Sequence, residues 1–188
     1  DVHLALGVPW WSFLVGKWIG LFASLAIALA PSLFLQALSF VAAGGSGAQF
    51  AALLLYSALL ASAIVSAGLL VSSASLNRST VVSLCIGTWL VLAVLLDFLV
   101  IGLLAATQGD VPDELVNALI LVNPLGSYRL LSYLHFFPQQ VEPLLYARGV
   151  GVAAAVAMLA AWVVGPLLAT GYRLTRIYRP VACKSTER

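Results

Sequence analysis

Four long runs of apolar residues, separated by short polar segments, dominate the chain. The runs cover residues 13–41, 50–71, 81–106 and 150–169. A helix needs about 20 mostly apolar residues to cross the hydrocarbon core of a bilayer, and each run reaches that length. The pattern predicts an all-α transmembrane fold with four membrane-spanning helices. Because proline disturbs a helix interior, we expect a kink in the first of them at Pro31.

The segment between the third and fourth runs, residues 107–148, differs from the rest of the chain. It contains four prolines and most of the acidic residues. Its apolar pieces, residues 115–122 and 130–137, are too short to cross a bilayer. Backbone at membrane depth must satisfy its hydrogen bonds within the protein, which favours helices over irregular chain. We therefore expect an interfacial or re-entrant helical segment on the outer side, with an ordinary structured loop as the alternative.

Composition supports a lipid environment and argues against several functions. Of 188 residues, 62% are hydrophobic and 9% are charged, whereas a soluble domain carries about 25% charged residues. The net charge of +2 gives no reason to expect nucleic acid as a partner. Cys85 and Cys183 lie far apart, with neither a disulfide framework nor a metal-ligand spacing. Ser127 and His135 lack a third, orienting group for catalysis, so we expect no enzyme.

Basic residues set the expected orientation. Lys17 begins the first run, Arg78 lies between the second and third runs, and the tail at residues 172–188 is basic. With an even number of spans these three positions lie on one side, and the positive-inside rule makes that side the cytoplasm. We expect a multi-pass protein of the cell's inner membrane with a cytoplasmic C-terminus. The chain has no phosphate-binding loop of the form G-x-x-x-x-G-K-[ST], so it does not bind ATP by that route.

One charged residue, Asp97, interrupts the third apolar run. It lies about 24 Å along the helix from Val81, in the outer part of the membrane. An intramembrane carboxylate is costly unless it is paired, hydrated or protonated. Three interpretations remain open: a structural ion pair, a substrate or proton-relay group, and a side chain that reaches the outer interface. Arg129, in the segment after the third run, is the partner we expect for an ion pair.

Small residues recur on the second run at helical spacing. Ala58, Ser62 and Ser66 follow each other at intervals of four residues. This spacing places them on one helix face, where small side chains favour close packing in lipid. A polar translocation path along the same face is the alternative interpretation.

Three stretches together resemble a known family. Residues 7–20 contain Pro9, Gly16 and Lys17, and residues 89–102 contain Asp97. Residues 121–131 read Leu-Val-Asn-Pro-Leu-Gly-Ser-Tyr-Arg-Leu-Leu, with the motif residues Asn123, Pro124, Tyr128 and Arg129. In order and spacing they are similar to ABC-2-type permeases, and among these to the nitrous-oxide reductase maturation permeases. Where relatives carry Arg after the first proline, this chain has Trp10-Trp11-Ser12, and Gly126 or Ser127 replaces their acidic residue.

The resemblance implies a permease subunit of an ABC exporter. It implies six membrane helices in a full subunit, of which this chain supplies the last four, a homodimer in the lipid bilayer, and two copies of a separate ATPase that binds ATP and Mg. The cargo it implies is a sulfur species or a copper-related cargo for a periplasmic copper enzyme, nitrous-oxide reductase, with a periplasmic accessory protein as a possible partner. Alternatives are an ABC-2 exporter of a drug, lipid or peptide, and a non-transporting membrane scaffold.

Overall fold

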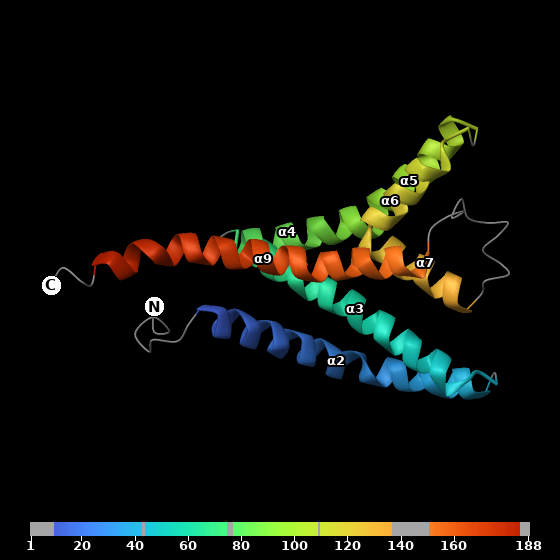
Figure 1. Ribbon diagram of the computed structural model, residues 1–188, viewed down its shortest axis with the longest axis horizontal. Coiled ribbons are helices and arrows are strands. Elements are labelled where there is room, and N and C mark those ends of the chain that lie inside the picture. The colour runs from blue at the N-terminus through green and yellow to red at the C-terminus, as the bar shows by residue number, and fades with distance from the viewer. Residues whose placement is uncertain (1–9, 43, 75–76, 109, 137–150, 185–188) are drawn as a thin grey trace.

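The computed structural model describes residues 10–42, 44–74, 77–108, 110–136 and 151–184. Within these ranges the chain is helical and contains no strand (Figure 1). The helices are α2 (Trp10–Ala42), α3 (Gly47–Ser72), α4 (Arg78–Leu90), the π-helix η1 (Val91–Leu95), α5 (Leu96–Ala106), α6 (Asp113–Val122), α7 (Pro124–Phe136) and α9 (Val152–Lys184). Pro9 and residues 137–148, which the sequence analysis singled out, lie outside the described residues.

Four helices are long and apolar enough to cross a membrane, which confirms the predicted all-α transmembrane fold. They are Trp11–Ala42, Gly47–Ser72, Arg78–Ala106 and Val152–Arg176. The third consists of α4, η1 and α5, which follow one another without a break in the helix. α2 continues through Pro31 without ending there. The last helix does not stop at residue 169, because α9 continues through most of the expected tail to Lys184.

The turn between α2 and α3 shows how local sequence ends one helix and begins the next. Gly44 has a φ of +78°, a backbone conformation that glycine adopts at little cost. Ser46 then caps α3: its Oγ accepts a hydrogen bond from the backbone N–H of Gln49 at 3.3 Å. In return the Gln49 side chain accepts from the backbone N–H of Ser46 at 3.1 Å. This reciprocal capping box brings the chain back antiparallel to α2.

α3 is the central helix, and its most extensive contact is with α9. The core between α3, α7 and α9 is formed by Tyr56, Leu131, Ala155 and Leu159. On α3, Ser62 and Ser66 are buried and donate hydrogen bonds to backbone carbonyls one turn earlier. Trp18 of α2 donates to Ser66 Oγ at 3.0 Å, so α2 packs over this small-residue face. The contact supports close packing as the role of the face.

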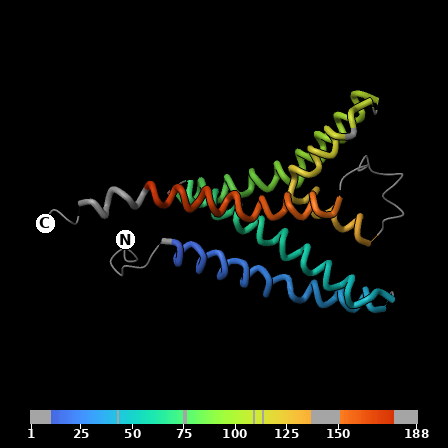
Figure 2. The backbone as a smooth tube through the Cα atoms, viewed as in Figure 1, coloured from blue at the N-terminus to red at the C-terminus, as the bar shows by residue number. Residues whose placement is uncertain are grey.

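α6 and α7 form a V-shaped helical hairpin that breaks at Asn123 (Figures 1 and 2). α6 contacts α5 and, to a smaller extent, α9, whereas α7 contacts mainly α9 and α3 and also touches η1. The starts of α2 and α4 and the end of α9 lie together at the opposite end of the bundle (Figure 1). We call this the basic end, because Lys17, Arg78 and Arg173 belong to these three segments.

The depth of the break follows from its neighbours. Asn123 contacts the Leu92 carbonyl, and Val122 contacts Trp162. Leu92 lies about 21 Å along its helix from Arg78, and Trp162 lies about 21 Å along α9 from Arg176. Since the hydrocarbon core is about 30 Å thick, the break lies inside it. The described part of this segment is helical, in two helices of 10 and 13 residues that are each too short to cross a bilayer.

Candidate functional site

The break at Asn123 lies at membrane depth, yet its polar backbone groups have partners. Asn123 itself is 2% exposed. Ser127 Oγ donates to the Leu121 carbonyl at 2.7 Å, and the indole N–H of Trp162 donates to the Val122 carbonyl at 2.9 Å. The backbone N–H of Ser127 donates to the Asn123 carbonyl at 2.8 Å. Non-helical backbone at this depth is tolerated only when buried and bonded within the protein, and these contacts meet that condition.

The Asn123 side chain joins the two halves of the hairpin. Its Oδ1 accepts a hydrogen bond from the backbone N–H of Leu125 at 3.1 Å, which caps the first turn of α7. Pro124 follows at the start of α7, where a missing N–H costs no helical hydrogen bond. The Asn-Pro pair therefore ends α6 and starts α7 in one step.

Gly126 is required by the tightness of this turn. A Cβ atom at Gly126 would lie 2.4 Å from the carbonyl oxygen of Ile120, a backbone atom that cannot rotate away. No side-chain-bearing residue fits there without moving α6 away from α7.

The hairpin tip also binds the π-helix in the third span. Asn123 Nδ2 donates to the carbonyl oxygen of Leu92, inside η1, at 2.8 Å. A π-helix widens the turn and disturbs the regular pairing of carbonyls with N–H groups, and such bulges occur frequently at functional sites. The same Nδ2 lies 3.5 Å from Asp97 Oδ1. The irregular part of the third span and the break in the hairpin therefore meet at one point.

The structure brings Asp97 and Arg129 together in an ion pair. Arg129 Nη1 donates to Asp97 Oδ2, joining α7 to α5. The Arg129 side chain is 51% exposed and that of Asp97 34% exposed, so the pair lies at the edge of the bundle. The pair closes one side of a cavity of about 260 Å³ between α5, α6 and α7, whose remaining walls are mostly apolar.

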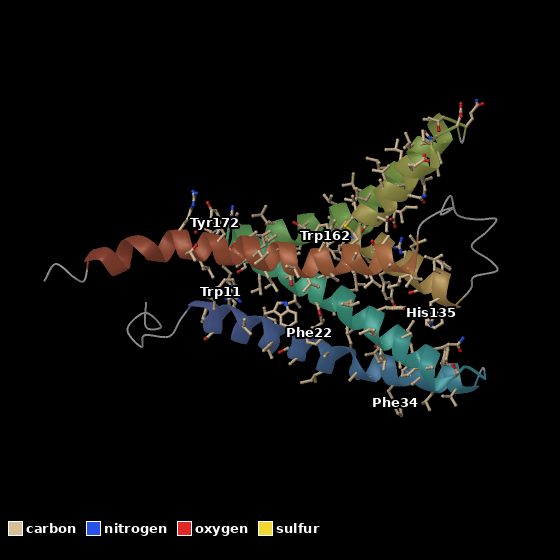
Figure 3. The ribbon with its side chains drawn as sticks, viewed as in Figure 1. Trp11, Phe22, Phe34, His135, Trp162 and Tyr172 are labelled. Atoms are coloured by element: carbon tan, nitrogen blue, oxygen red, sulfur yellow. The ribbon has the colours of Figure 1, made fainter. Side chains whose placement is uncertain are left out.

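α7 is fastened to α3 on its other face. Tyr56 of α3 and His135 of α7 form a hydrogen bond of 3.3 Å between the hydroxyl and Nδ1, near the C-terminal end of α7 (Figure 3). Tyr128, a residue of the family motif, forms a hydroxyl–hydroxyl contact of 3.3 Å with Ser57. The two residues considered for catalysis are therefore used elsewhere, since Ser127 bonds the Leu121 carbonyl and His135 bonds Tyr56.

The other motif residues lie apart from this site. Lys17 is exposed near the start of α2, and a Cβ added at Gly16 would meet no atom within 4 Å. In the described part of the chain, no group of three His, Cys, Asp or Glu side chains could hold a metal ion. Cys85 is a half-buried free thiol that lines a second, apolar cavity of about 110 Å³.

Sequence reasoning missed three contributors to the site: the π-helix, Gly126 as a steric requirement, and Trp162. The π-helix has no distinctive residues, since Val91–Leu95 is uniformly apolar. Trp162 had a weak signal, because a tryptophan in the middle of an apolar span needs a partner for its N–H when it is buried. Figure 3 places it on α9 beside the hairpin.

A family model described as ABC-2 family transporter protein matches residues 2–177. No curated protein matches the chain.

Proposed function

Since the chain belongs to the ABC-2 family of transporter proteins, we propose that it is the permease of an ABC exporter whose outer gate is the α6–α7 hairpin. As a member of this family the chain is a membrane permease component of an ABC transporter, and it works with an ABC ATPase. The observation that carries the gate is the helix break at Asn123. It is buried in the hydrocarbon region and bonded to both neighbouring spans, α9 through Trp162 and the third span through Leu92.

The hairpin suits a gate because it occupies one half of the membrane only. Broken helices at membrane depth are the elements around which transporters build cargo pathways. Here the hairpin fills the space between the third span and α9 on the side away from the basic end. Displacement of α5 and α6 from α7 would open that side.

Orientation and energy source complete the proposal. The basic end faces the cytoplasm, because Lys17, Arg78 and the arginines of α9 belong to it. The protein is then an inner-membrane subunit with a cytoplasmic C-terminus. Two permease copies dock two ATPase subunits, which bind ATP and Mg and drive the rearrangement.

The proposed cargo is a sulfur species or a copper-related cargo for maturation of nitrous-oxide reductase, delivered with a periplasmic accessory protein. Residues 121–131 support this, because Asn123, Pro124, Tyr128 and Arg129 all take part in the site. The departure at Gly126 or Ser127 favours a second candidate, an ABC-2 exporter of a drug, lipid or peptide, since the maturation permeases that residues 121–131 resemble carry an acidic residue there.

Two measurements test the proposal. Affinity purification of the complete subunit from native membranes should recover an ATPase with a phosphate-binding loop, and failure to recover one would remove the transporter assignment. With the reconstituted complex, ATP hydrolysis is then measured with sulfide, with Cu(I), and with representative drugs and lipids. Stimulation by sulfide or copper supports the maturation cargo, whereas stimulation by drugs or lipids alone supports the second candidate.

A further inference from the structure

The cavity beside the Asp97–Arg129 pair has the features of a binding site for a polar group. Its volume is about 260 Å³, and α5, α6 and α7 all contribute to its lining. Asp97, Asn123 and Arg129 supply polar atoms, while Val100, Leu119 and other apolar side chains form the remaining walls. The second cavity, of about 110 Å³ beside Cys85, is smaller and lacks a charged lining residue.

The depth of the ion pair matches the level of lipid head groups. Asp97 lies about 29 Å along the third span from Arg78. Since the hydrocarbon core is about 30 Å thick, the pair reaches the boundary of the leaflet farther from the basic end. Lipid phosphates are found at that boundary. The guanidinium of Arg129, which pairs with Asp97 and is 51% exposed, lies at the same level.

The chemistry of Arg129 selects a phosphate. A guanidinium carries five N–H donors, and its contact with Asp97 uses Nη1. At the head-group boundary the exposed half of this cation favours an anionic partner, and a phosphodiester can accept two parallel hydrogen bonds from it. Ile101 lines the cavity and is also exposed, so it offers apolar surface for acyl chains next to the head group.

We propose that this cavity binds the head group of a phospholipid from the leaflet farther from the basic end, with the phosphate on Arg129. The volume of about 260 Å³ is below the roughly 300–1,000 Å³ of pockets that enclose drug-sized ligands. The cavity therefore holds the head group, and the acyl chains remain in the bilayer. The proposal concerns a resident lipid and does not depend on the cargo or on the ATPase.

Native mass spectrometry of the complete subunit in detergent tests the site. The protein is titrated with phosphatidylglycerol, and separately with a diacylglycerol that has the same chains and no phosphate. We expect phosphatidylglycerol to bind at least tenfold more tightly than the diacylglycerol. Equal affinity for the two lipids would overturn the proposal, because the phosphate would then contribute nothing.

Three variants locate the site. Arg129→Gln should abolish the tenfold preference, whereas Arg129→Lys should keep part of it. Val100→Trp should fill the cavity and weaken phosphatidylglycerol binding at least fivefold while it leaves both charges in place. Arg78→Gln, which removes a cation from the basic end, is the control and should bind as the wild type does. Unchanged phosphatidylglycerol binding in Arg129→Gln or in Val100→Trp places the lipid elsewhere and refutes the proposal. Cross-linking that joins a second copy of the chain to the cavity also refutes it, because the second copy would then occupy the site.

Discussion

The hairpin contacts two membrane-spanning segments, α9 and α4–η1–α5, in two different ways. α9 contributes Ala155 and Leu159, both fully buried, to a packed core with Leu131 of α7. α4, η1 and α5 contribute no buried residue among those described. Polar contacts join this span to the hairpin: the Leu92 carbonyl accepts from Asn123, and Asp97 pairs with Arg129.

This difference indicates which part moves. Packed apolar contacts are lost all at once when helices separate, whereas a half-exposed ion pair can exchange its partner for water or lipid head groups. We therefore expect α7 to stay fixed on α3 and α9. We expect α5 to move away from it, with the motion beginning at the π-helix η1.

The largest effect is expected from a cavity in the fixed contact. Leu131→Ala removes a side chain that is 0% exposed, which should destabilise the protein by about 2–5 kcal/mol. Leu99→Ala is the matched control, because Leu99 is 50% exposed on α5 and should change stability little. Thermal unfolding in detergent compares the two variants. Similar losses in both would show that α5 is packed as tightly as α7.

Gly126→Ala should have the next largest effect, because its Cβ would lie 2.4 Å from the Ile120 carbonyl oxygen. We expect a loss of about 1–3 kcal/mol, the usual cost of overpacking. Gly87→Ala in α4 has no atom within 4 Å of the added carbon. It should be neutral or stabilising by up to about 1 kcal/mol, because alanine favours helix. A stable Gly126→Ala variant would mean that the hairpin turn is looser than described.

Trp162→Phe should cost about 0.5–1.5 kcal/mol, because it removes the donor to the Val122 carbonyl and keeps most of the ring. Trp89→Phe is the control, since Trp89 is 57% exposed on α4. Hydrogen–deuterium exchange should show faster exchange at the end of α6 in Trp162→Phe only. Unchanged exchange there would exclude Trp162 as a support of the break.

The smallest effect is expected from the ion pair between Asp97 of α5 and Arg129 of α7. A double-mutant cycle with Asp97→Asn and Arg129→Gln should give a coupling energy of up to about 1 kcal/mol, as for other partly exposed pairs. Both stability and cargo-stimulated ATP hydrolysis are measured in the four proteins of the cycle. Strictly additive losses in both measurements would show that the pair does not act as a unit.

The sequence predicts the spans because apolar runs of about twenty residues are stable in lipid as helices that cross the bilayer. It also points to Asp97 and Arg129, because a charge in an apolar run demands a partner and few are available. It does not predict η1, since the apolar residues of the π-helix would fit an ordinary α-helix equally well. Gly126 and Trp162 depend on how α6, α7 and α9 approach one another, which local sequence does not specify.

We expect α5 to move relative to a fixed α7 when ATP binds the partner ATPase. Electron-resonance distance measurements on the reconstituted complex test it, with spin labels at Leu55 of α3 and Ile101 of α5, and in a second protein at Leu55 and Tyr133 of α7. In both labelled proteins Cys85 and Cys183 are replaced by serine, so that the spin label attaches only at the chosen positions. Labelled subunits are diluted with unlabelled ones, so that each distance is measured within one subunit. A non-hydrolysable ATP analogue should change the Leu55–Ile101 distances and leave the Leu55–Tyr133 distances as they were. Equal changes in both label distances, or no change in either distance while the nucleotide is bound, would contradict a movement of α5 relative to α7.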